Sequence, residues 1–266
     1  MHIITVANEK GGVGKTTTTV SLASALGQTK RVLVIDLDSQ AHATEWFGVL
    51  ASHVPVERSS YAVMIGQTPL ANTILRTEEM GVTLCAAHAW LAKATHELTA
   101  KVDGLFTLRD ALEALGEAGI ALDYVLIDCP PSKGAVVFNA LIAADLVIAP
   151  VLAESLSMEG MGELAETVRR VRQRYSPDLA PPRILINNYE GRSAADRQIH
   201  DYLQTQFGPQ VFRTEIGRDA PLRECFAARM SILRYRRGAR SAAQFLALAD
   251  EIMEALDVAE AEEGTF

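Results

Sequence analysis

Short apolar stretches rich in β-branched residues recur along the chain and alternate with longer stretches that carry apolar residues at helical spacing. A short apolar run bounded by polar residues is typical of a strand buried on both faces of a sheet. The predicted strands are residues 3–7, 32–35, 82–85, 124–127, 146–150, 184–186 and 211–214. The predicted helices include residues 16–26, 105–115, 160–175, 193–207 and 241–256. This alternation predicts an α/β fold with a doubly wound, mostly parallel sheet flanked by helices.

The 266 residues are predicted to form one domain, residues 1–256, followed by an acidic tail, residues 257–266, that we expect to be flexible. With 48% hydrophobic and 22% charged residues, the composition is that of a globular domain with enough apolar material for a buried sheet. Right-handed crossovers bring the strand-to-helix loops to one edge of such a sheet. Ligand-binding residues are therefore expected on those loops.

The cysteines and the apolar runs exclude several classes of protein. Cys85, Cys129 and Cys225 lie far apart in the sequence and form no CxxC pair, so neither a disulfide framework nor a zinc or iron–sulfur site is indicated. The sequence contains no secretory signal and no run of roughly twenty apolar residues. A cytoplasmic location is expected.

A glycine-rich segment follows the first predicted strand and leads into the next predicted helix. Glycines allow the backbone to wrap closely around a phosphate with its N–H groups pointing inward. A P-loop in this context binds ATP and Mg²⁺: Lys15 is expected to reach the β and γ phosphates, and the Thr16 hydroxyl to bind the metal. The residues predicted to contact nucleotide in this segment are Lys10, Gly11, Gly12, Val13, Gly14, Lys15, Thr16 and Thr17.

Carboxylates follow two of the predicted strands. Asp36 and Asp38 come at and after the end of the strand 32–35, where residues two apart point to the same side of an extended chain. We therefore expect both carboxylates at the loop edge of the sheet. Asp128 follows the strand 124–127 and has the place of a Walker B carboxylate, whose oxygen meets Mg²⁺, usually through water.

The glycine-rich segment departs from the ordinary P-loop pattern in two places. Glu9 stands where the first glycine would be, and Lys10 is a second lysine five residues before Lys15. This arrangement resembles the deviant Walker A motif of the ParA/MinD family of ATPases, and the chain is most similar to its ParA branch. Residues 36–40 look like that family's DxDPQ segment, with Ser39 in place of proline, and residues 127–132 match its IDCPPS form closely. The resemblance covers residues 3 to about 256.

The resemblance implies roles for individual residues. The catalytic set would be Lys10, Lys15 and Asp38: Lys10 would reach the phosphates bound by the other subunit, so that ATP closes a homodimer, and Asp38 would position or activate the attacking water. Asp36 would support the metal, so the predicted metal-binding residues are Thr16, Asp36 and Asp128.

Two asparagines and one lysine complete this comparison. Asn187 and Asn188 end the strand 184–186, where the family contacts the adenine base. Lys133 stands where the family commonly has an apolar residue, which puts the local contacts of this loop in question.

Arginines give the C-terminal third a local basic character. The net charge of the chain is −8, yet every basic residue between Arg169 and Arg240 is an arginine. This region resembles the part of ParA proteins that binds double-stranded DNA without reading its sequence, and hydrolysis, stimulated by a ParB-like partner, would release that DNA at the nucleoid. A solvated charged face, or pairing of the arginines with Glu215, Asp219 and Glu224, is the alternative. The predicted DNA-binding residues are Arg218, Arg229, Arg234, Arg236, Arg237 and Arg240.

Two other functions of related proteins are alternatives. A MinD-like protein binds the membrane through a basic amphipathic helix near its C-terminus. This chain ends in acidic residues, among them Glu254, Asp257 and Glu260, that anionic lipid would repel, so no membrane partner is expected. A metabolic or redox relative of the same fold is the second alternative, and its iron–sulfur members require paired cysteines that this sequence does not offer.

Overall fold

The computed structural model describes residues 1–152, 157–191 and 194–263. This part of the chain contains an eight-stranded sheet with the order β3-β4-β2-β5-β1-β6-β7-β8. Neighbouring strands are parallel, except that β3 is antiparallel to β4. The predicted fold class is confirmed. The strands are β1 (His2–Val6), β2 (Val32–Asp36), β3 (Ile74–Arg76), β4 (Val82–Cys85), β5 (Tyr124–Asp128), β6 (Leu146–Leu152), β7 (Arg183–Tyr189) and β8 (Ile216–Gly217).

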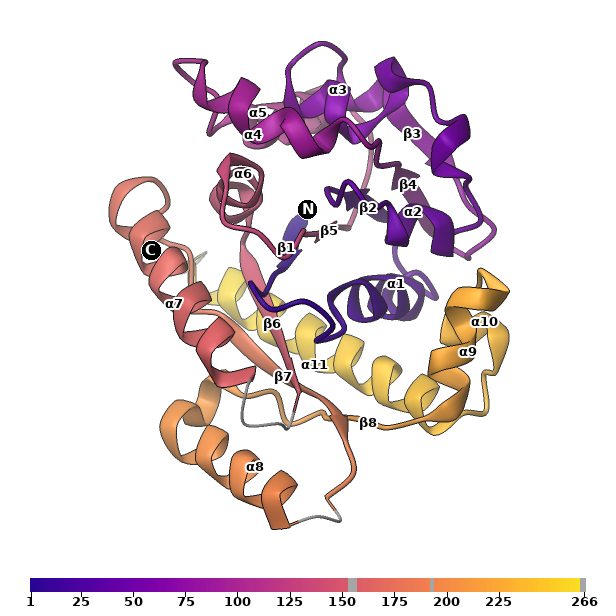
Figure 1. Cartoon of the computed structure of the whole chain (residues 1–266), viewed down its shortest axis with the longest axis vertical. Coiled ribbons are helices and arrows are strands. Elements are labelled where there is room, and N and C mark those ends of the chain that lie inside the picture. Colours follow the sequence, from indigo (N-terminus) through magenta and orange to yellow (C-terminus); the bar gives the residue numbers. More distant parts are fainter. Residues whose placement is uncertain (153–156, 192–193, 264–266) are drawn as a thin grey trace.

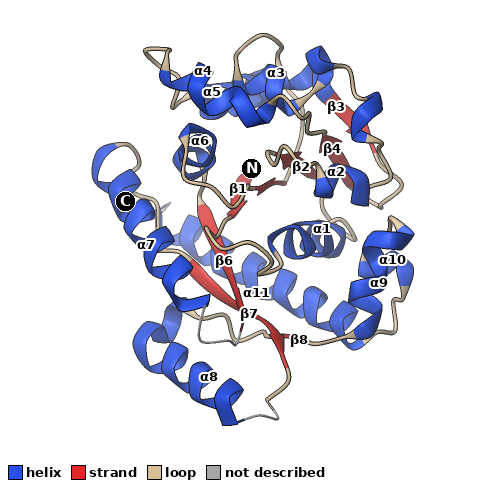
Figure 2. Ribbon diagram, in the orientation of Figure 1, coloured by secondary structure: helices blue, strands red, loops and turns tan. Residues whose placement is uncertain are grey.

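Helices cover both faces of the sheet (Figures 1 and 2). They are α1 (Lys15–Leu26), α2 (His42–Trp46), α3 (Ser60–Met64), α4 (Leu91–Thr99), α5 (Thr107–Glu117), α6 (Ala135–Ala143), α7 (Ser157–Arg174), α8 (Ala194–Phe207), α9 (Ala220–Ala228), α10 (Ile232–Tyr235) and α11 (Arg240–Glu263). Short 3₁₀ helices lie at Ala51–His53, Val56–Arg58, Leu70–Thr73 and Gly208–Gln210. Among the described residues, no helix combines the length and hydrophobicity needed to cross a membrane.

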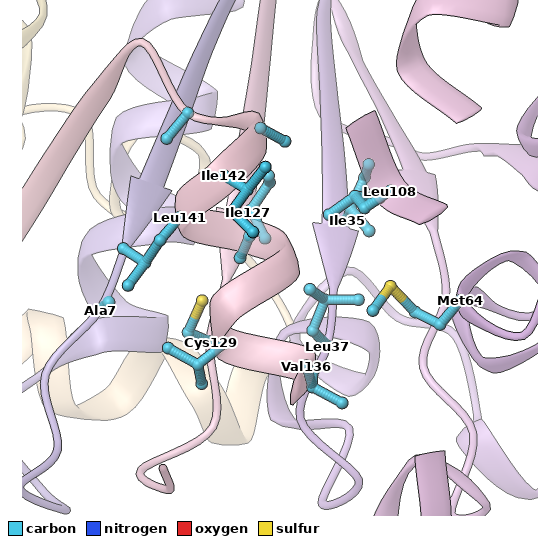
Figure 3. Close-up of a cluster of buried hydrophobic side chains, with 14 of the residues drawn as sticks. Ala7, Ile35, Leu37, Met64, Leu108, Ile127, Cys129, Val136, Leu141 and Ile142 are labelled. Atoms are coloured by element: carbon cyan, nitrogen blue, oxygen red, sulfur yellow. The ribbon is translucent and has the colours of Figure 1, made fainter. Parts of the chain in front are cut away.

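Strand β2 shows why the central strands are apolar throughout. Leu33 and Ile35 pack into the core formed with helices α3 to α7, whereas Val32 and Val34 pack into the core formed with α1 and α11. Side chains alternate between the two faces of a strand, so a strand covered on both faces needs apolar residues at every position. Figure 3 shows part of the first core, where Ile35 and neighbouring side chains from the sheet meet those of α6 and the surrounding helices.

The predicted strand at residues 211–214 is wrong. Val211 makes only an isolated bridge with Ile184, and the last strand, β8, lies further on. The amides of Arg213 and Thr214 donate instead to the two carboxylate oxygens of Glu251 in α11, each at 3.0 Å. A carboxylate from a helix thus satisfies the backbone groups that a neighbouring strand would have bonded.

The bounds of two predicted helices, 241–256 and 193–207, also differ from expectation. Helix α11 continues to Glu263, past the predicted end at residue 256, and residues 264–266 of the predicted tail lie outside the described residues. Helix α8 begins at Ala194, and the predicted start at residue 193 lies outside the described residues as well. The antiparallel edge strand β3 was not predicted, because its three residues are too short a run to stand out.

The order of the strands brings the predicted site residues to one edge. Asp36 of β2 and Val6 of β1 both align with Asp128 of β5, and Leu152 of β6 aligns with Asn187 of β7. Because these strands are parallel, their carboxyl ends meet at the same edge of the sheet. The loop between β1 and α1 begins at that edge (Figure 1).

Candidate functional site

The glycine-rich loop joins β1 to the N-terminus of α1. Gly12 and Gly14 have φ angles of 77° and 93°, in the left-handed region that favours glycine. Gly14 is also in close contact with β7, because a Cβ atom there would lie 2.1 Å from Nδ2 of Asn187. Val13 between them is fully buried and anchors the loop. Gly14 caps α1 through its backbone, so the first N–H groups of that helix face the loop, as they do in an anion site.

Lys15 is buried at the start of α1, and its Nζ donates to the carbonyl of Lys10 at 3.0 Å. Burial lowers the pKa of Lys15, and the negative charges of Asp128 and Asp38 partly offset this effect. An anion in the loop would stabilise this buried ammonium. The amide of Lys10 donates to Asn8 Oδ1 at 3.0 Å, so the backbone of Lys10 is held on both sides. Its side chain is half-buried and has no ion-pair partner within the described residues.

Asp128 lies at the end of β5, buried, beside the start of α1. Its two oxygens accept hydrogen bonds from the hydroxyls of Thr16, at 2.8 Å, and Thr19, at 3.0 Å. Burial and the neighbouring Asp36 charge raise the pKa of Asp128 to about 8. Thr19 was not predicted, although its position three residues after Thr16 places both hydroxyls on one face of the helix.

Asp36 holds the loop that follows β2. Its Oδ2 accepts from both the amide and the hydroxyl of Thr44, at 2.8 and 2.7 Å, and its Oδ1 accepts from the amide of Asp38 at 3.1 Å. Burial raises the pKa of Asp36 to about 6, against the effect of these hydrogen bonds. Asp38 is half-buried and accepts from the amide of Gln40 at 2.9 Å. Asp36 is thus fully engaged in fixing the loop, and Asp38 is the more accessible of the two carboxylates.

These donors fit a magnesium ion bound together with phosphates. Mg²⁺ is usually held by one or two protein oxygens, with water and phosphate supplying the other ligands. The described residues contain no cluster of three or more His, Cys, Asp or Glu side chains that could hold a metal alone, whereas Thr16 and Asp128 offer two adjacent oxygens. A cation beside Asp128 would also offset the burial and repulsion that raise its pKa.

A cavity of about 440 Å³ opens next to the glycine-rich loop. Gly12, Gly14 and Thr17 line one side, and Asn187 and Asn188 line another. A cavity of this size matches those that bind small ligands in proteins. The remaining lining residues, which we did not predict from the sequence, are Trp46, Leu152, Gly217, Asp219, Leu222, Arg223 and Phe226.

The two asparagines lie differently in this cavity. Asn187 donates from Nδ2 to the carbonyl of Val13 at 2.9 Å, so its amide ties β7 to the loop. Asn188 follows with a φ of 57°, and its amide donates to Asn187 Oδ1. Trp46 and Phe226 form an aromatic wall of the same cavity, and their rings meet edge to face with centroids 5.5 Å apart. No signal in the sequence links these two aromatic residues, because they are far apart in the chain.

The predicted DNA-binding arginines are all exposed and lie around α9, α10 and the start of α11. Arg218 pairs with Glu190 at 3.4 Å, Arg234 pairs with Glu78, and Arg240 donates to the carbonyl of Arg218 at 2.7 Å. The other three, Arg229, Arg236 and Arg237, make no ion pair within the part of the chain that the structure describes.

The acidic residues that offered an alternative role for these arginines are engaged elsewhere. Glu215 pairs with His200 at 2.8 Å, and Glu224 accepts from the hydroxyl of Tyr235 at 2.8 Å. Asp219 accepts from the amide and hydroxyl of Ser241. Arg229, Arg236 and Arg237 are therefore the three that stay exposed without an ion pair within the described residues, as a solvated charged face would also have them.

The fold and this loop define a P-loop nucleotide-binding protein, and comparison with known proteins is consistent with that class. Residues 1–181 match the AAA_31 family, described as an AAA domain. The chain is 38% identical to the chromosome-partitioning ATPase Soj of Thermus thermophilus over 251 residues, which cover 94% of each chain. It is 33% identical to the chromosome partitioning protein ParA of Caulobacter vibrioides over 254 residues, covering 95% of this chain and 94% of the relative.

A solved structure agrees over the same length. The crystal structure of a cobyrinic acid a,c-diamide synthase from Mycobacterium smegmatis superposes with a TM-score of 0.81 at 31% identity, covering 95% of this chain and 93% of the other. The chain therefore belongs to the ParA/MinD type of P-loop ATPase, as the resemblance of its motifs predicted.

Proposed function

We propose that this chain is an ATP-hydrolysing positioning ATPase of the partition type, whose ATP-bound homodimer binds double-stranded DNA without sequence preference. The observation that carries the ATPase part is the contact between the glycine-rich loop and the Walker B carboxylate, Thr16 to Asp128, next to the buried Lys15. Relatives named for chromosome partitioning, at 33–38% identity, support the choice of process. We expect a cytoplasmic, nucleoid-associated protein with a ParB-like activator.

The protein's own residues would act in defined ways on the nucleotide. The N–H groups of the loop from Gly11 to Thr17 would bind the phosphates, and Lys15 would exchange its bond with the Lys10 carbonyl for one with the β and γ phosphates. The cavity beside Asn187 and Asn188 would hold the base and ribose. Mg²⁺, held through Thr16 and Asp128, would neutralise charge on the phosphates.

Hydrolysis would depend on positioning rather than on covalent chemistry. Asp38, the accessible carboxylate at the end of β2, would orient the attacking water, while Asp36 keeps its loop in place through Thr44. The side chain of Lys10, which is unpaired within the described residues, would extend to the nucleotide of the second subunit. Since the γ-phosphate contacts exist only before hydrolysis, they would give the dimer its dependence on ATP.

The test is binding to a nonspecific DNA fragment without nucleotide, with ADP, with ATP and with a slowly hydrolysed ATP analogue, at two salt concentrations. We expect salt-sensitive binding with ATP or the analogue only, and none for Lys15→Ala. Nucleotide-independent DNA binding would instead indicate a simple DNA-binding module. Absence of DNA binding in every state would contradict the DNA role and favour a membrane-associated or metabolic relative of this fold, which vesicle binding and substrate screening would then separate.

A further inference from the structure

A buried carboxylate from another part of the chain, Glu79, bonds to the turn between α9 and α10. Glu79 lies in the turn between β3 and β4 and is 7% exposed. Its Oε1 accepts from the amide of Ser231 at 2.9 Å, and its Oε2 accepts from the hydroxyls of Ser24 and Ser231, at 2.9 and 2.8 Å. Within residues 1–152, 157–191 and 194–263, no cationic side chain forms an ion pair with Glu79. Hydrogen bonds therefore satisfy this carboxylate.

These bonds connect the turn to the helix that begins at the glycine-rich loop. Ser24 belongs to α1, whose first residues, Lys15 and Thr16, are proposed to bind phosphate and metal. The hydroxyls of Ser24 and Ser231 also lie 2.8 Å apart, so that Glu79 and the two serines form one buried cluster. Helix α10 packs against α1 (Figure 1). The α9–α10 turn is thus bonded to the helix of the proposed nucleotide site.

A second bond joins the same turn to α2. The indole Nε1 of Trp46 donates to the carbonyl of Met230 at 2.7 Å. Helix α2 follows the loop that carries Asp38, the carboxylate proposed to orient the attacking water. Met230 directly precedes Ser231 in the sequence. Elements that follow two segments of the proposed nucleotide site therefore meet at one point of the chain.

The arginines beside this turn depend on it for their position. Arg229 precedes the turn, with a φ of 52°, and Arg234, Arg236 and Arg237 follow it on and just after α10. Helix α10 has only four residues, too few to be stable without tertiary contacts. Ser231 is its N-cap and accepts from the amide of Arg234 at 3.2 Å. A bond that fixes Ser231 therefore fixes the start of the segment that carries three of these arginines.

We propose that Glu79 is a positioning residue of the α9–α10 surface: it holds the α9–α10 turn against α1 and so orients Arg229, Arg236 and Arg237 for DNA. This inference rests on the proposed DNA binding. Glu79 contacts neither DNA nor nucleotide; it acts through Ser231. A buried carboxylate without a cation is a costly way to join two helices, so stability alone does not account for it.

The experiment measures the affinity of the full chain for a labelled nonspecific DNA duplex by fluorescence anisotropy, with Mg²⁺ and a saturating, slowly hydrolysed ATP analogue. Glu79→Ala should weaken DNA binding about three- to tenfold, the effect of one or two misaligned polar contacts. Electrostatics alone predict the opposite sign, because the loss of a negative charge near arginines strengthens DNA binding. Glu78→Gln, which removes the exposed partner of Arg234, is the matched charge control and should not weaken DNA binding.

Two milder variants separate positioning from general destabilisation. Ser24→Ala removes only the hydroxyl that links Glu79 to α1, and it should weaken DNA binding about two- to fivefold. Glu79→Gln keeps an oxygen for the Ser231 amide and should retain most of the affinity. Isothermal titration calorimetry should show unchanged nucleotide affinity in both variants. The control Ser176→Ala breaks a 3.1 Å bond to the Ile142 carbonyl and should leave DNA binding unchanged.

Trp46 reports the position of the turn without DNA. In a Trp90→Phe protein it is the only tryptophan. Glu79→Ala should then shift its emission, because the Met230 carbonyl that accepts from its Nε1 moves. Unchanged emission would overturn the proposal.

DNA affinities of Glu79→Ala and Ser24→Ala equal to that of the unmodified protein would also overturn it. So would a Ser176→Ala protein that loses as much DNA affinity as Ser24→Ala, since general destabilisation would then explain both losses. If the unmodified protein binds no DNA in any nucleotide state, the proposed function itself has failed. The emission of Trp46 still shows in that case whether Glu79 positions the turn.

Discussion

Gly14 shows how a single residue links the loop to the sheet. Its φ of 93°, and the 2.1 Å that would separate a Cβ atom from Nδ2 of Asn187, leave no room for a side chain. We expect Gly14→Ala to lower the free energy of unfolding by about 1–3 kcal/mol, through backbone strain and displacement of Asn187. Urea unfolding measures this change.

Gly11, in the same loop, provides the control. Gly11 has no left-handed φ, and a Cβ atom there would meet nothing within 4 Å. Gly11→Ala should therefore change the stability by less than about 0.5 kcal/mol, whatever it does to nucleotide affinity. A Gly14→Ala protein as stable as Gly11→Ala would show that the loop relaxes freely around Asn187.

Asp128 makes stability depend on pH in the protein free of metal and nucleotide. Its pKa is raised to about 8 by burial and by Asp36, so the folded protein holds this proton more tightly than the unfolded chain does. The resulting stability is present at low pH and is lost as the pH rises through about 8. Asp128→Asn, which cannot ionise, should be the more stable protein above pH 8, by about 1–3 kcal/mol, and the difference should shrink towards pH 6.

The measurement is thermal unfolding with a chelator across this pH range. Asp123→Asn is a control of opposite sign, because hydrogen bonds from Arg31 hold the pKa of Asp123 below its usual range. That variant should lose stability at neutral pH. If the stability difference between Asp128→Asn and the unmodified protein does not vary with pH, Asp128 is not a buried carboxyl with a raised pKa.

At the scale of elements, Glu251 of α11 bonds to the backbone of residues 213 and 214, where the sequence predicted a strand. Its carboxylate accepts from the amides of Arg213 and Thr214 and pairs with Arg183 at 3.0 Å. We expect Glu251→Ala to cost about 2–4 kcal/mol of stability, because it leaves two amides and a half-buried guanidinium without their partner. Chemical denaturation tests this. Glu254→Gln changes an exposed residue that pairs with Arg213, so it should lower the stability little. Equal losses in the two variants would show that the backbone hydrogen bonds of Glu251 contribute no more than a surface ion pair.

The same example shows where sequence reasoning succeeds and fails. The central strands could be predicted because burial on both faces demands continuous apolar runs such as residues 32–35 and 124–127, and the glycine-rich loop because its backbone must wrap a phosphate. Residues 211–214 begin with two apolar residues, Val211 and Phe212, but continue with Arg213 and Thr214, whose amides bond to a helix carboxylate instead of a strand. The aromatic wall of the cavity, Trp46 and Phe226, depends on contacts between α2 and α9, which no local pattern encodes.

At the scale of the whole molecule, an acidic protein with net charge −8 carries several exposed arginines around α9 and α10. If these arginines bind DNA, the affinity should depend on phosphate neutralisation and therefore on salt. We expect Arg236→Ala combined with Arg237→Ala to weaken ATP-dependent DNA binding about tenfold or more at low salt. The slope of log affinity against log salt should become shallower by up to about two units.

The matched control removes two adjacent exposed arginines elsewhere. Arg169 and Arg170 lie on α7 and both pair with Glu166, at 2.7 and 3.0 Å. Their double alanine variant changes the net charge by the same amount but leaves the α9–α10 surface intact. Equal loss of DNA affinity in the two double variants would mean that overall charge, rather than this surface, attracts DNA.

If only the Arg236, Arg237 double variant loses DNA affinity, and it still binds ATP, the DNA contact lies beside α9. Leu222, Arg223 and Phe226 of that helix line the cavity beside the glycine-rich loop. A nucleotide in that cavity would then act on the DNA-binding surface through one short helix.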